Sequence, residues 1–467
     1  MLILFGALSS LWSQDRDYPM GISEEEDELL EQMQQKVVLT RSLYDDINLP
    51  DSFSLKDFAP YPGDQSNYGT CTTWAVSYAA RTIIEAQLRG WTDRNQITAD
   101  AFTPAFTYRL IQPERPDCWG SATPSAVYSL KVDGALPLKD WKGLDPEREF
   151  HCPDSIETRY REIATNYKIQ DYTRLFLSRE EVNNKTARVK LSLFNNNPVV
   201  ISMKCPKSFH REKKPYWTPT ETDEYGEHGR HAMTVVGYDD DQFGGSFEIQ
   251  NSWGDSWNED GYIWVRYEDF DTYVYAAIEL AQLPVPEPKT PLFKGGLSVY
   301  SITANADLTA RWDENISGYQ VEQDVTQGDR LRFYLNNDQP AYVYLLGTGS
   351  VDRTVSQLFP FPGESALLNY KENVVPIPNE DAFLEADATV GTDYLYLLFS
   401  REAIDMRQLT RVLNQDDRPL EMRLGDYFGE QLISPSDIQQ DDNQIQFETF
   451  ETQTDRVLAL KVAFRHI

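Results

Sequence analysis

A proline-rich stretch past the middle of the chain sets the main limit on how it can fold. Residues 283–291 hold four prolines in nine residues. Proline fixes its own φ angle and disfavours the helical conformation in the residue before it, so this stretch predicts an extended, semi-rigid linker. A chain of 467 residues also exceeds what one hydrophobic core normally supports. We therefore expect two domains, at residues 47–283 and 292–467, with a linker at 284–291.

The two halves of the first domain carry different hydrophobic patterns. Apolar residues recur at helical spacing after Cys71, over 99–111 and over 124–132. Short β-branched and aromatic runs between glycine or aspartate turns then predict antiparallel strands at 198–203, 232–238, 246–251 and 261–267. A helical half followed by a sheet half indicates an α+β unit with a cleft between its two parts.

The remaining segments complete the expected organisation. Beyond the linker, alternating segments separated by turns predict a mainly β, sandwich-like domain with helices near 404–413 and 420–428. Residues 15–46 are acidic, and Ser23 with Glu26 forms a capping-box pattern. We expect an arm with a short helix there, lying on the main domain.

The first residues and the net charge bear on location and partners. Residues 1–8 are apolar and lead into small and polar residues up to 14, which resembles a secretory signal that lacks its basic start. No later stretch reaches the ~18 apolar residues of a membrane span. We expect an exported protein, secreted, periplasmic or at the cell surface. A formal charge of -31 argues against nucleic acid and anionic lipid as partners, because it repels phosphate.

Four cysteines are compatible with one disulfide plus free thiols, and we favour the pair Cys118 and Cys152. Cys71 falls near the first turn of a predicted helix, where the helix dipole favours a thiolate. A catalytic cysteine needs a base and a group that orients the base. His231 opens one predicted strand, with His228 as the nearest competing histidine, and Asn251 ends another. An amide there can orient an imidazole while Trp253 shields the hydrogen bond from water.

These segments resemble, in order, the motifs of the papain family of cysteine peptidases. Gln65 stands six residues before Cys71, and the other two matches are HAMTVVGY from His231 and IQNSWGDSWNEDGY from Ile249. The resemblance covers roughly residues 47–283. It implies a two-lobed fold and hydrolysis of peptide bonds in peptides or proteins through a thioester acyl-enzyme, with no metal or cofactor.

The resemblance also implies a role for each matched residue. Cys71 would be the nucleophile, held as a thiolate by a protonated His231, which Asn251 orients and Trp253 covers. The Gln65 side chain and the Cys71 backbone N–H would bind the oxyanion. Substrate binding is implied for five further residues, with the backbone held at the first two and the main specificity pocket lined by the others, leaving room for a bulky side chain: Gly120, Ser121, Ala122, Thr123 and Ser202.

The chain also departs from the family pattern. Thr72 stands where tryptophan is usual, and Tyr68 where a structural cysteine is usual. The segment before residue 47 is too short for the family's long inhibitory pro-region, so we do not expect control by a large propeptide. The second domain resembles an accessory domain of unknown function in bacterial proteins, which suggests a binding or positioning module with a protein or glycan partner.

Two other functions use the same residues. An amidase or transglutaminase-like acyl transferase could use the cysteine and histidine, because acyl-enzyme chemistry leaves the acceptor open. A binding protein could have kept the fold and lost turnover. The context of Gln65 and Asn251 favours the peptidase.

Overall fold

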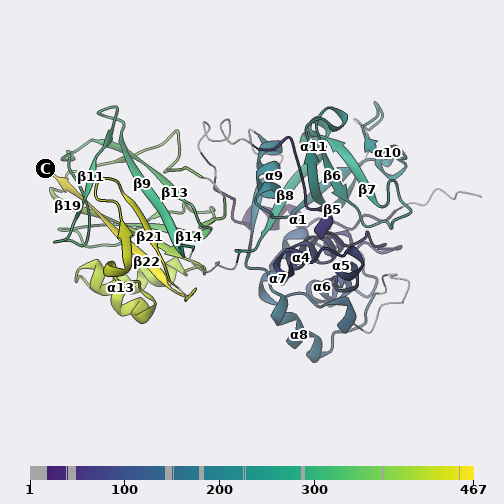
Figure 1. Cartoon of the computed structure of the whole chain (residues 1–467). Helices are drawn as coiled ribbons and strands as arrows, with labels where there is room; N and C mark the ends of the chain where they lie inside the picture. Colours follow the sequence, from purple (N-terminus) through teal and green to yellow (C-terminus); the bar gives the residue numbers. More distant parts are fainter. Residues whose placement is uncertain are drawn as a thin grey trace, which may run out of the picture.

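The computed structural model describes residues 18–37, 39, 49–141, 150, 152–177, 184–223, 226, 228–284, 290–370, 373–451 and 453–467. The expected signal segment at 1–14 and most of the expected linker lie outside these residues. The described residues form two bodies side by side (Figure 1). The first combines helices with a largely antiparallel sheet and the second consists mainly of strands, which confirms the expected fold class.

The helical half of the first body is built around one continuous helix. It runs from α3 (Cys71–Thr73) through the π-helical η2 (Trp74–Arg81) into α4 (Thr82–Arg89). It ends at Gly90, whose φ of 63° is the left-handed conformation that commonly terminates helices. The other helices of this half are α5 (Arg94–Ala99), α6 (Pro104–Ile111), α7 (Thr123–Val132) and α8 (Thr158–Ala164).

The single helix expected over 99–111 is wrong, because the chain breaks between α5 and α6. Pro104 opens α6 and disfavours helical geometry in Thr103, which is extended with a ψ of 125°. The Thr103 hydroxyl then accepts a hydrogen bond from the Ala105 N–H and caps α6.

The sheet half packs its strands against the helical half. Among the described residues, eight strands form one sheet in the order β2-β8-β3-β5-β6-β7-β4, with β1 paired to β5. Their bounds are β1 (Ser52–Ser54), β2 (Asp171–Leu177), β3 (Val199–Cys205), β4 (Tyr216–Trp217), β5 (Gly229–Asp239), β6 (Ser246–Gln250), β7 (Tyr262–Arg266) and β8 (Val274–Ala281). Three helices accompany the sheet: α9 (Lys185–Phe194), α10 (Lys207–His210) and α11 (Tyr267–Tyr273). The register pairs Ser202 of β3 with Ala232 of β5, which brings two predicted site segments together.

The second body contains two further sheets in the described part of the chain. One has the order β17-β13-β9-β21-β20, with β10 and β18 attached; the other has the order β11-β12-β22-β19-β14-β15, with β16 attached. Apolar residues such as Phe333 and Leu460 fill the space between the sheets. Leu398 and other residues on the outer face of the second sheet pack with α12 (Met406–Leu413) and α13 (Leu420–Phe428), at the positions expected for helices.

The strands of the second body have the following bounds: β9 (Phe293–Ser301), β10 (Ala306–Leu308), β11 (Ala310–Asp313), β12 (Gly318–Val321), β13 (Arg330–Asn337), β14 (Ala341–Gly349), β15 (Ser356–Phe359), β16 (Leu367–Leu368), β17 (Val375–Ile377), β18 (Leu384–Glu385), β19 (Gly391–Ser400), β20 (Ile438–Gln440), β21 (Gln446–Thr449) and β22 (Val457–His466).

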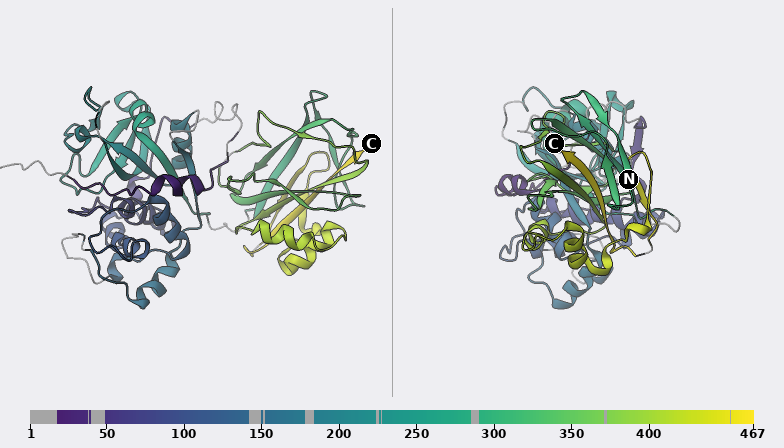
Figure 2. Two further views of the ribbon diagram at one scale, coloured as in Figure 1. Left: turned by 180° about the vertical axis from the view of Figure 1, so that it is seen from behind. Right: turned by 90° about the vertical axis from the view of Figure 1, so that its left-hand side faces the viewer.

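Residues 18–37, called here the N-terminal segment, run along the first body to the second. Helix α1 (Glu26–Gln32) lies across the junction of the helical and sheet halves (Figure 2). Farther along, Gln35 forms parallel bridges with Arg174 of β2 and with Glu364 of the second body. The expected capping box at Ser23 is wrong: α1 has no side-chain cap at its start, because the Glu26 side chain is buried between the two halves instead.

A buried ion pair fixes the far end of the N-terminal segment. The Lys36 ammonium pairs with the Glu279 carboxylate of β8, and both side chains are buried. Glu279 also accepts hydrogen bonds from the Ser192 hydroxyl at 2.6 Å and from the Asn369 amide at 2.9 Å. One carboxylate therefore connects the segment, the first body and the second body.

Candidate functional site

Cys71 is the first residue of α3 and lies where the helical half meets the sheet half. Its side chain is fully buried, with a relative exposure of 0%. The backbone N–H groups of Ala232, Gly21 and Thr72 face the thiol. These come from β5, from the N-terminal segment and from the helix itself, so the thiol is enclosed on three sides.

His231 precedes Ala232 on β5 and is held in one orientation. Its Nε2 lies 2.8 Å from the Asn251 carboxamide oxygen, which can only accept, so Nε2 carries the proton. The Trp253 ring stacks on the imidazole at 4.6 Å between centroids. The other ring nitrogen, Nδ1, is buried and has no hydrogen-bond partner among the described residues. In a neutral imidazole this Nδ1 is the basic nitrogen.

Gln65 lies beside this pair and is fixed by its neighbours. Its carboxamide oxygen accepts from the Ser252 hydroxyl at 2.6 Å. Its Nε2 donates to the carbonyl oxygens of Tyr68 at 2.8 Å and Pro19 at 3.0 Å. The amide therefore already holds a peptide carbonyl that belongs to the N-terminal segment.

The start of the N-terminal segment covers the site. The Tyr18 ring stacks on Trp253 at 4.6 Å. The Gly21 carbonyl accepts from the Ser121 N–H at 2.9 Å, and the Ser23 N–H donates to the Ser121 carbonyl at 3.1 Å. A side chain at Gly21 would collide with the backbone, since a Cβ there would lie 2.0 Å from the Gly69 oxygen. Glycine is thus what allows the segment to approach this closely.

Burial under the segment shifts both titratable groups toward their neutral forms. Loss of water raises the pKa of the Cys71 thiol to about 11, and a nearby Glu26 carboxylate adds to the rise. Burial lowers the pKa of His231 to about 3 against the opposing effect of its Asn251 hydrogen bond. In the covered form thiol and imidazole are therefore neutral around pH 7, whereas the sequence led us to expect a thiolate and an imidazolium.

Residues expected to bind substrate surround the buried Glu26 carboxylate, which lies near the thiol. Thr123, at the start of α7, donates its backbone N–H to a Glu26 carboxylate oxygen at 2.8 Å. The Ser202 hydroxyl donates to the other oxygen at 2.5 Å. Ala122 is buried and immediately precedes α7. The Ser121 hydroxyl shares a hydrogen bond with the hydroxyl of Thr72, the residue that stands where tryptophan is usual.

The Gly120 backbone forms hydrogen bonds with the first body and not with the N-terminal segment, unlike that of its neighbour Ser121. Its N–H donates to the Gly69 carbonyl at 3.0 Å, and its own carbonyl accepts from the Tyr108 hydroxyl at 3.2 Å. Only the Ser121 backbone contacts the N-terminal segment in the way expected for both residues. Nearby, Cys118 and Cys152 form a disulfide, and Cys205 is a free, buried thiol.

Sequence reasoning missed four residues of this site: Ser252, Gly21, Glu26 and Arg230, whose guanidinium lies near Glu26 and donates to the Tyr275 hydroxyl at 2.9 Å. Ser252 adjoins Asn251 in a motif already noticed, so its place in the sequence was a usable signal. Gly21, Arg230 and Glu26 gave none, because their roles depend on a segment that folds back over residues far along the chain. Within the described part of the chain, no cluster of three or more histidine, cysteine or acidic side chains could hold a metal ion. No helix there is long and apolar enough to cross a membrane.

The fold and this geometry define a thiol-containing two-lobed domain, and comparison with known proteins shows which family model part of it matches. Residues 133–278 match the model of the papain family cysteine proteases, and residues 324–403 match a domain of unknown function, DUF4384. The matched region includes His231 and Asn251. Cys71 and Gln65 precede the matched residues.

The relatives are distant. Ananain from Ananas comosus is 24% identical over 206 residues, which span 39% of this chain and 57% of that protein. A peptidase C1-like protein of Acanthamoeba polyphaga mimivirus is 22% identical over 208 residues, 44% of this chain and 64% of its own. The chain thus spans less than two thirds of either relative. Among solved structures, xylellain, a cysteine protease from Xylella fastidiosa, aligns with a TM-score of 0.44 and 22% identity over 57% of this chain and 96% of that one.

Proposed function

We propose that the chain is a cysteine peptidase that cleaves peptide bonds at Cys71. One observation carries this proposal: a peptide segment already lies at the thiol, with a carbonyl oxygen on the Gln65 amide and its backbone paired to Ser121. The site thus binds extended polypeptide next to a cysteine and a histidine.

The proposed reaction uses the groups described above. His231 Nδ1 takes the Cys71 proton, and the sulfur attacks the substrate carbonyl carbon. The negative oxygen that forms accepts hydrogen bonds from Gln65 Nε2 and the Cys71 N–H. His231 then gives its proton to the departing amine, which leaves a thioester on Cys71. Water attacks the thioester with His231 as base and releases the acid and the free thiol. Asn251 keeps the Nε2 proton in place throughout.

The N-terminal segment must leave before a substrate can enter. It covers the thiol with Gly21 and takes the amide donor with Pro19, so the described form is a closed one. We propose that this short segment regulates access, although the sequence suggested no large inhibitory propeptide.

Export and domain organisation complete the proposal. The apolar residues 1–8 and the Cys118–Cys152 disulfide support an exported protein, because disulfides persist in oxidising compartments. We propose domains at 47–283 and 292–467, and the separate sheets of the two bodies support this division. The second domain would position the peptidase, and the N-terminal segment that covers it, relative to a protein or glycan partner.

The full-length Gly21→Ala variant provides the test. It should unseat the segment without changing a residue of the proposed catalytic group, and it should cleave a peptide library under reducing conditions. Adding Cys71→Ala, or an epoxide thiol inhibitor, should abolish cleavage. Cleavage that survives Cys71→Ala would refute the mechanism. Transfer to added amines that outpaces hydrolysis would favour the acyl transferase, and absence of both turnover and labelling at Cys71 would favour a binding protein.

A further inference from the structure

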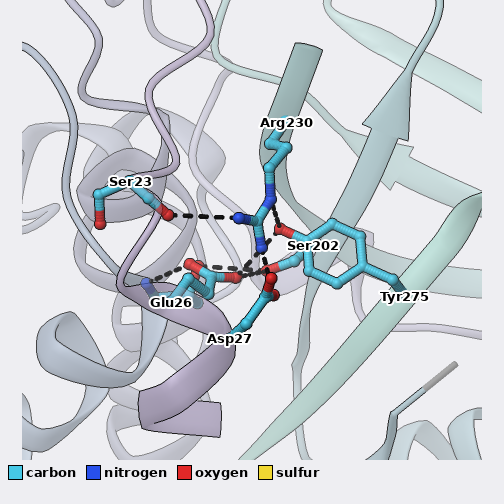
Figure 3. Close-up of polar contacts among 7 residues, drawn as sticks. Ser23, Glu26, Asp27, Ser202, Arg230 and Tyr275 are labelled. Carbon is cyan, nitrogen blue, oxygen red and sulfur yellow. Dashed lines mark hydrogen bonds and ion pairs between the residues drawn. The ribbon is translucent and has the colours of Figure 1, made fainter. Parts of the chain in front are cut away.

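The pocket beside the thiol is filled by a carboxylate of the chain itself. Glu26 is fully buried, with 0% exposure. Four residues supply polar groups around it: the Thr123 N–H at the start of α7, the Ser202 hydroxyl, the Tyr275 hydroxyl at 3.4 Å and the Arg230 guanidinium behind Tyr275. Figure 3 shows Ser202 and Tyr275 reaching this acid, with Arg230 beside it and bonded to Tyr275.

Arg230 is the fixed positive charge of this pocket. Its Nε donates to the Tyr275 hydroxyl at 2.9 Å, and its ring-facing guanidinium lies 4.7 Å from the Tyr275 centroid. Its Nη2 donates to the Asp27 carboxylate at 2.5 Å, and its Nη1 to the Ser23 carbonyl at 3.4 Å. Tyr275 thus fixes the guanidinium from the sheet side, while the acidic groups come from the N-terminal segment (Figure 3).

When the segment leaves, the pocket loses both of these carboxylates. Glu26 and Asp27 are on the same helical turn, so they depart together. Arg230 and the donors of Thr123 and Ser202 then face the space next to the thiol. A neighbouring cavity of about 470 Å³ is lined by Arg230 and Tyr275 and also by Lys204. In a chain with a net charge of -31, this is a local concentration of donors and positive charge.

We propose that this pocket selects an acidic side chain, glutamate or aspartate, in the peptide substrate, and that Glu26 occupies its place in the closed form. The inference rests on the proposed peptidase function and names its substrate class. This preference for an acidic side chain takes the place of the bulky side chain that we expected from the small residues lining the pocket. The Thr123 N–H and the hydroxyls of Ser202 and Tyr275 donate to the acid, and the positive charge of Arg230 lies nearby. An apolar side chain would leave these buried donors unpaired, which is why such a pocket discriminates against apolar side chains.

Binding can be measured without turnover. The protein is the full-length Gly21→Ala/Cys71→Ala variant, and the probes are acetylated fluorescent tetrapeptides that carry Glu, Gln or Leu at each of three positions before the labelled amide. At one position the Glu peptide should bind about 10- to 100-fold more tightly than the Leu peptide, as expected where an apolar side chain leaves buried hydrogen-bond donors unpaired. Arg230→Gln should remove most of this ratio, and Arg230→Lys should retain part of it.

Arg266→Gln is the matched control. Arg266 is an arginine of similar side-chain exposure, 32% against 25% for Arg230, and it pairs with Glu268 and Asp269 away from the pocket. It should leave the Glu to Leu ratio unchanged. A ratio near one at all positions, or no binding of either peptide, would overturn the inference even if Gly21→Ala cleaves other peptides. A ratio that depends on Arg230 supports the pocket even if Gly21→Ala proves inactive, in which case only the peptidase proposal fails.

Discussion

At the scale of single residues, Cys71 and His231 are both neutral in the closed form. The pKa of Cys71 is about 11 and that of His231 about 3, so between these values the thiol keeps its proton and the imidazole stays neutral. Desolvation is the first cause in both cases. Water that enters when Gly21 moves away would lower the first pKa and raise the second, which favours the reactive ion pair.

Alkylation of Cys71 should report this difference. In the full-length protein with Cys205→Ser, the iodoacetamide rate at Cys71 should be low at neutral pH and rise toward pH 11, because only the thiolate reacts. Adding Gly21→Ala should shift the rise to lower pH and make labelling fast at neutral pH. Mass spectrometry of the labelled peptide measures both rates. Identical pH profiles would show that the segment does not control the thiol.

Gln65 should matter to the rate more than to binding. In the Gly21→Ala background, Gln65→Ala should lower kcat by about 10²- to 10³-fold, since one oxyanion donor typically contributes this much. Ser252→Ala should have a smaller effect, because Gln65 keeps its contact with the Tyr68 carbonyl. Gln357→Ala in the second body is the control and should change nothing. A change confined to KM would contradict the proposed role of Gln65.

Which residues the sequence could reveal depended on how local their signal was. Cys71, His231, Asn251 and Gln65 sit in short motifs on a helix and on strands whose periodicity is clear. His231 contacts Asn251, Gln65 contacts the adjacent Ser252, and the Ala232 N–H next to His231 faces the Cys71 thiol. The pairing of Glu26 with Thr123 and Ser202 joins three segments far apart in the chain. No pattern within any one of them could predict it, and Glu26 was interpreted as a helix cap.

At the scale of elements, α1 carries the closing carboxylate, and its docking should depend on pH. Burial raises the pKa of docked Glu26 above its ordinary value of 4.5. Docking is therefore strongest below that ordinary value and weakens as pH rises through the docked pKa. The charged or titratable groups facing Glu26 are Arg230 of β5, Tyr275 of β8 and Cys71 of α3.

The ratio of kcat/KM for the parent to that for Gly21→Ala reports how far the segment is displaced at each pH. Measuring the same ratio with Glu26→Gln in both proteins isolates the part due to Glu26, because Cys71 and His231 are unchanged by that substitution. The parent ratio should rise with pH above the ordinary Glu26 pKa of 4.5, and Glu26→Gln should make this rise smaller, because an amide does not titrate. A parent ratio that falls with pH would give the linkage the opposite sign and exclude Glu26 as its cause.

Elements themselves were predicted well where their pattern was strong. The strands β3, β5, β6 and β7 and the helices α12 and α13 appear where the periodicity placed them. The helix after Cys71 contains a π-helical stretch, η2, that no propensity distinguishes from α-helix. Such stretches are frequent near functional sites and reflect tertiary packing.

At the scale of the whole molecule, the Lys36–Glu279 pair should contribute strongly to the union of the two bodies. Lys36→Ala leaves Glu279 buried without its cation, a change that typically costs about 3–5 kcal/mol. We expect a clearly lower Tm by calorimetry. Lys294→Ala is the control, because that lysine is 46% exposed and pairs with Asp338 only at 3.6 Å. Equal shifts in the two variants would contradict a special role for Lys36.

The Lys36–Glu279 ion pair keeps the N-terminal segment attached near the site when the site opens. A segment anchored to both bodies meets the pocket by an intramolecular step, with an effective concentration that for short tethers reaches about millimolar. Mass action then makes closure independent of protein concentration, so dilution does not open the site. A free acidic peptide must instead outcompete a tethered one, and cutting the chain between α1 and Lys36 would turn the inhibitor into a ligand that diffuses away.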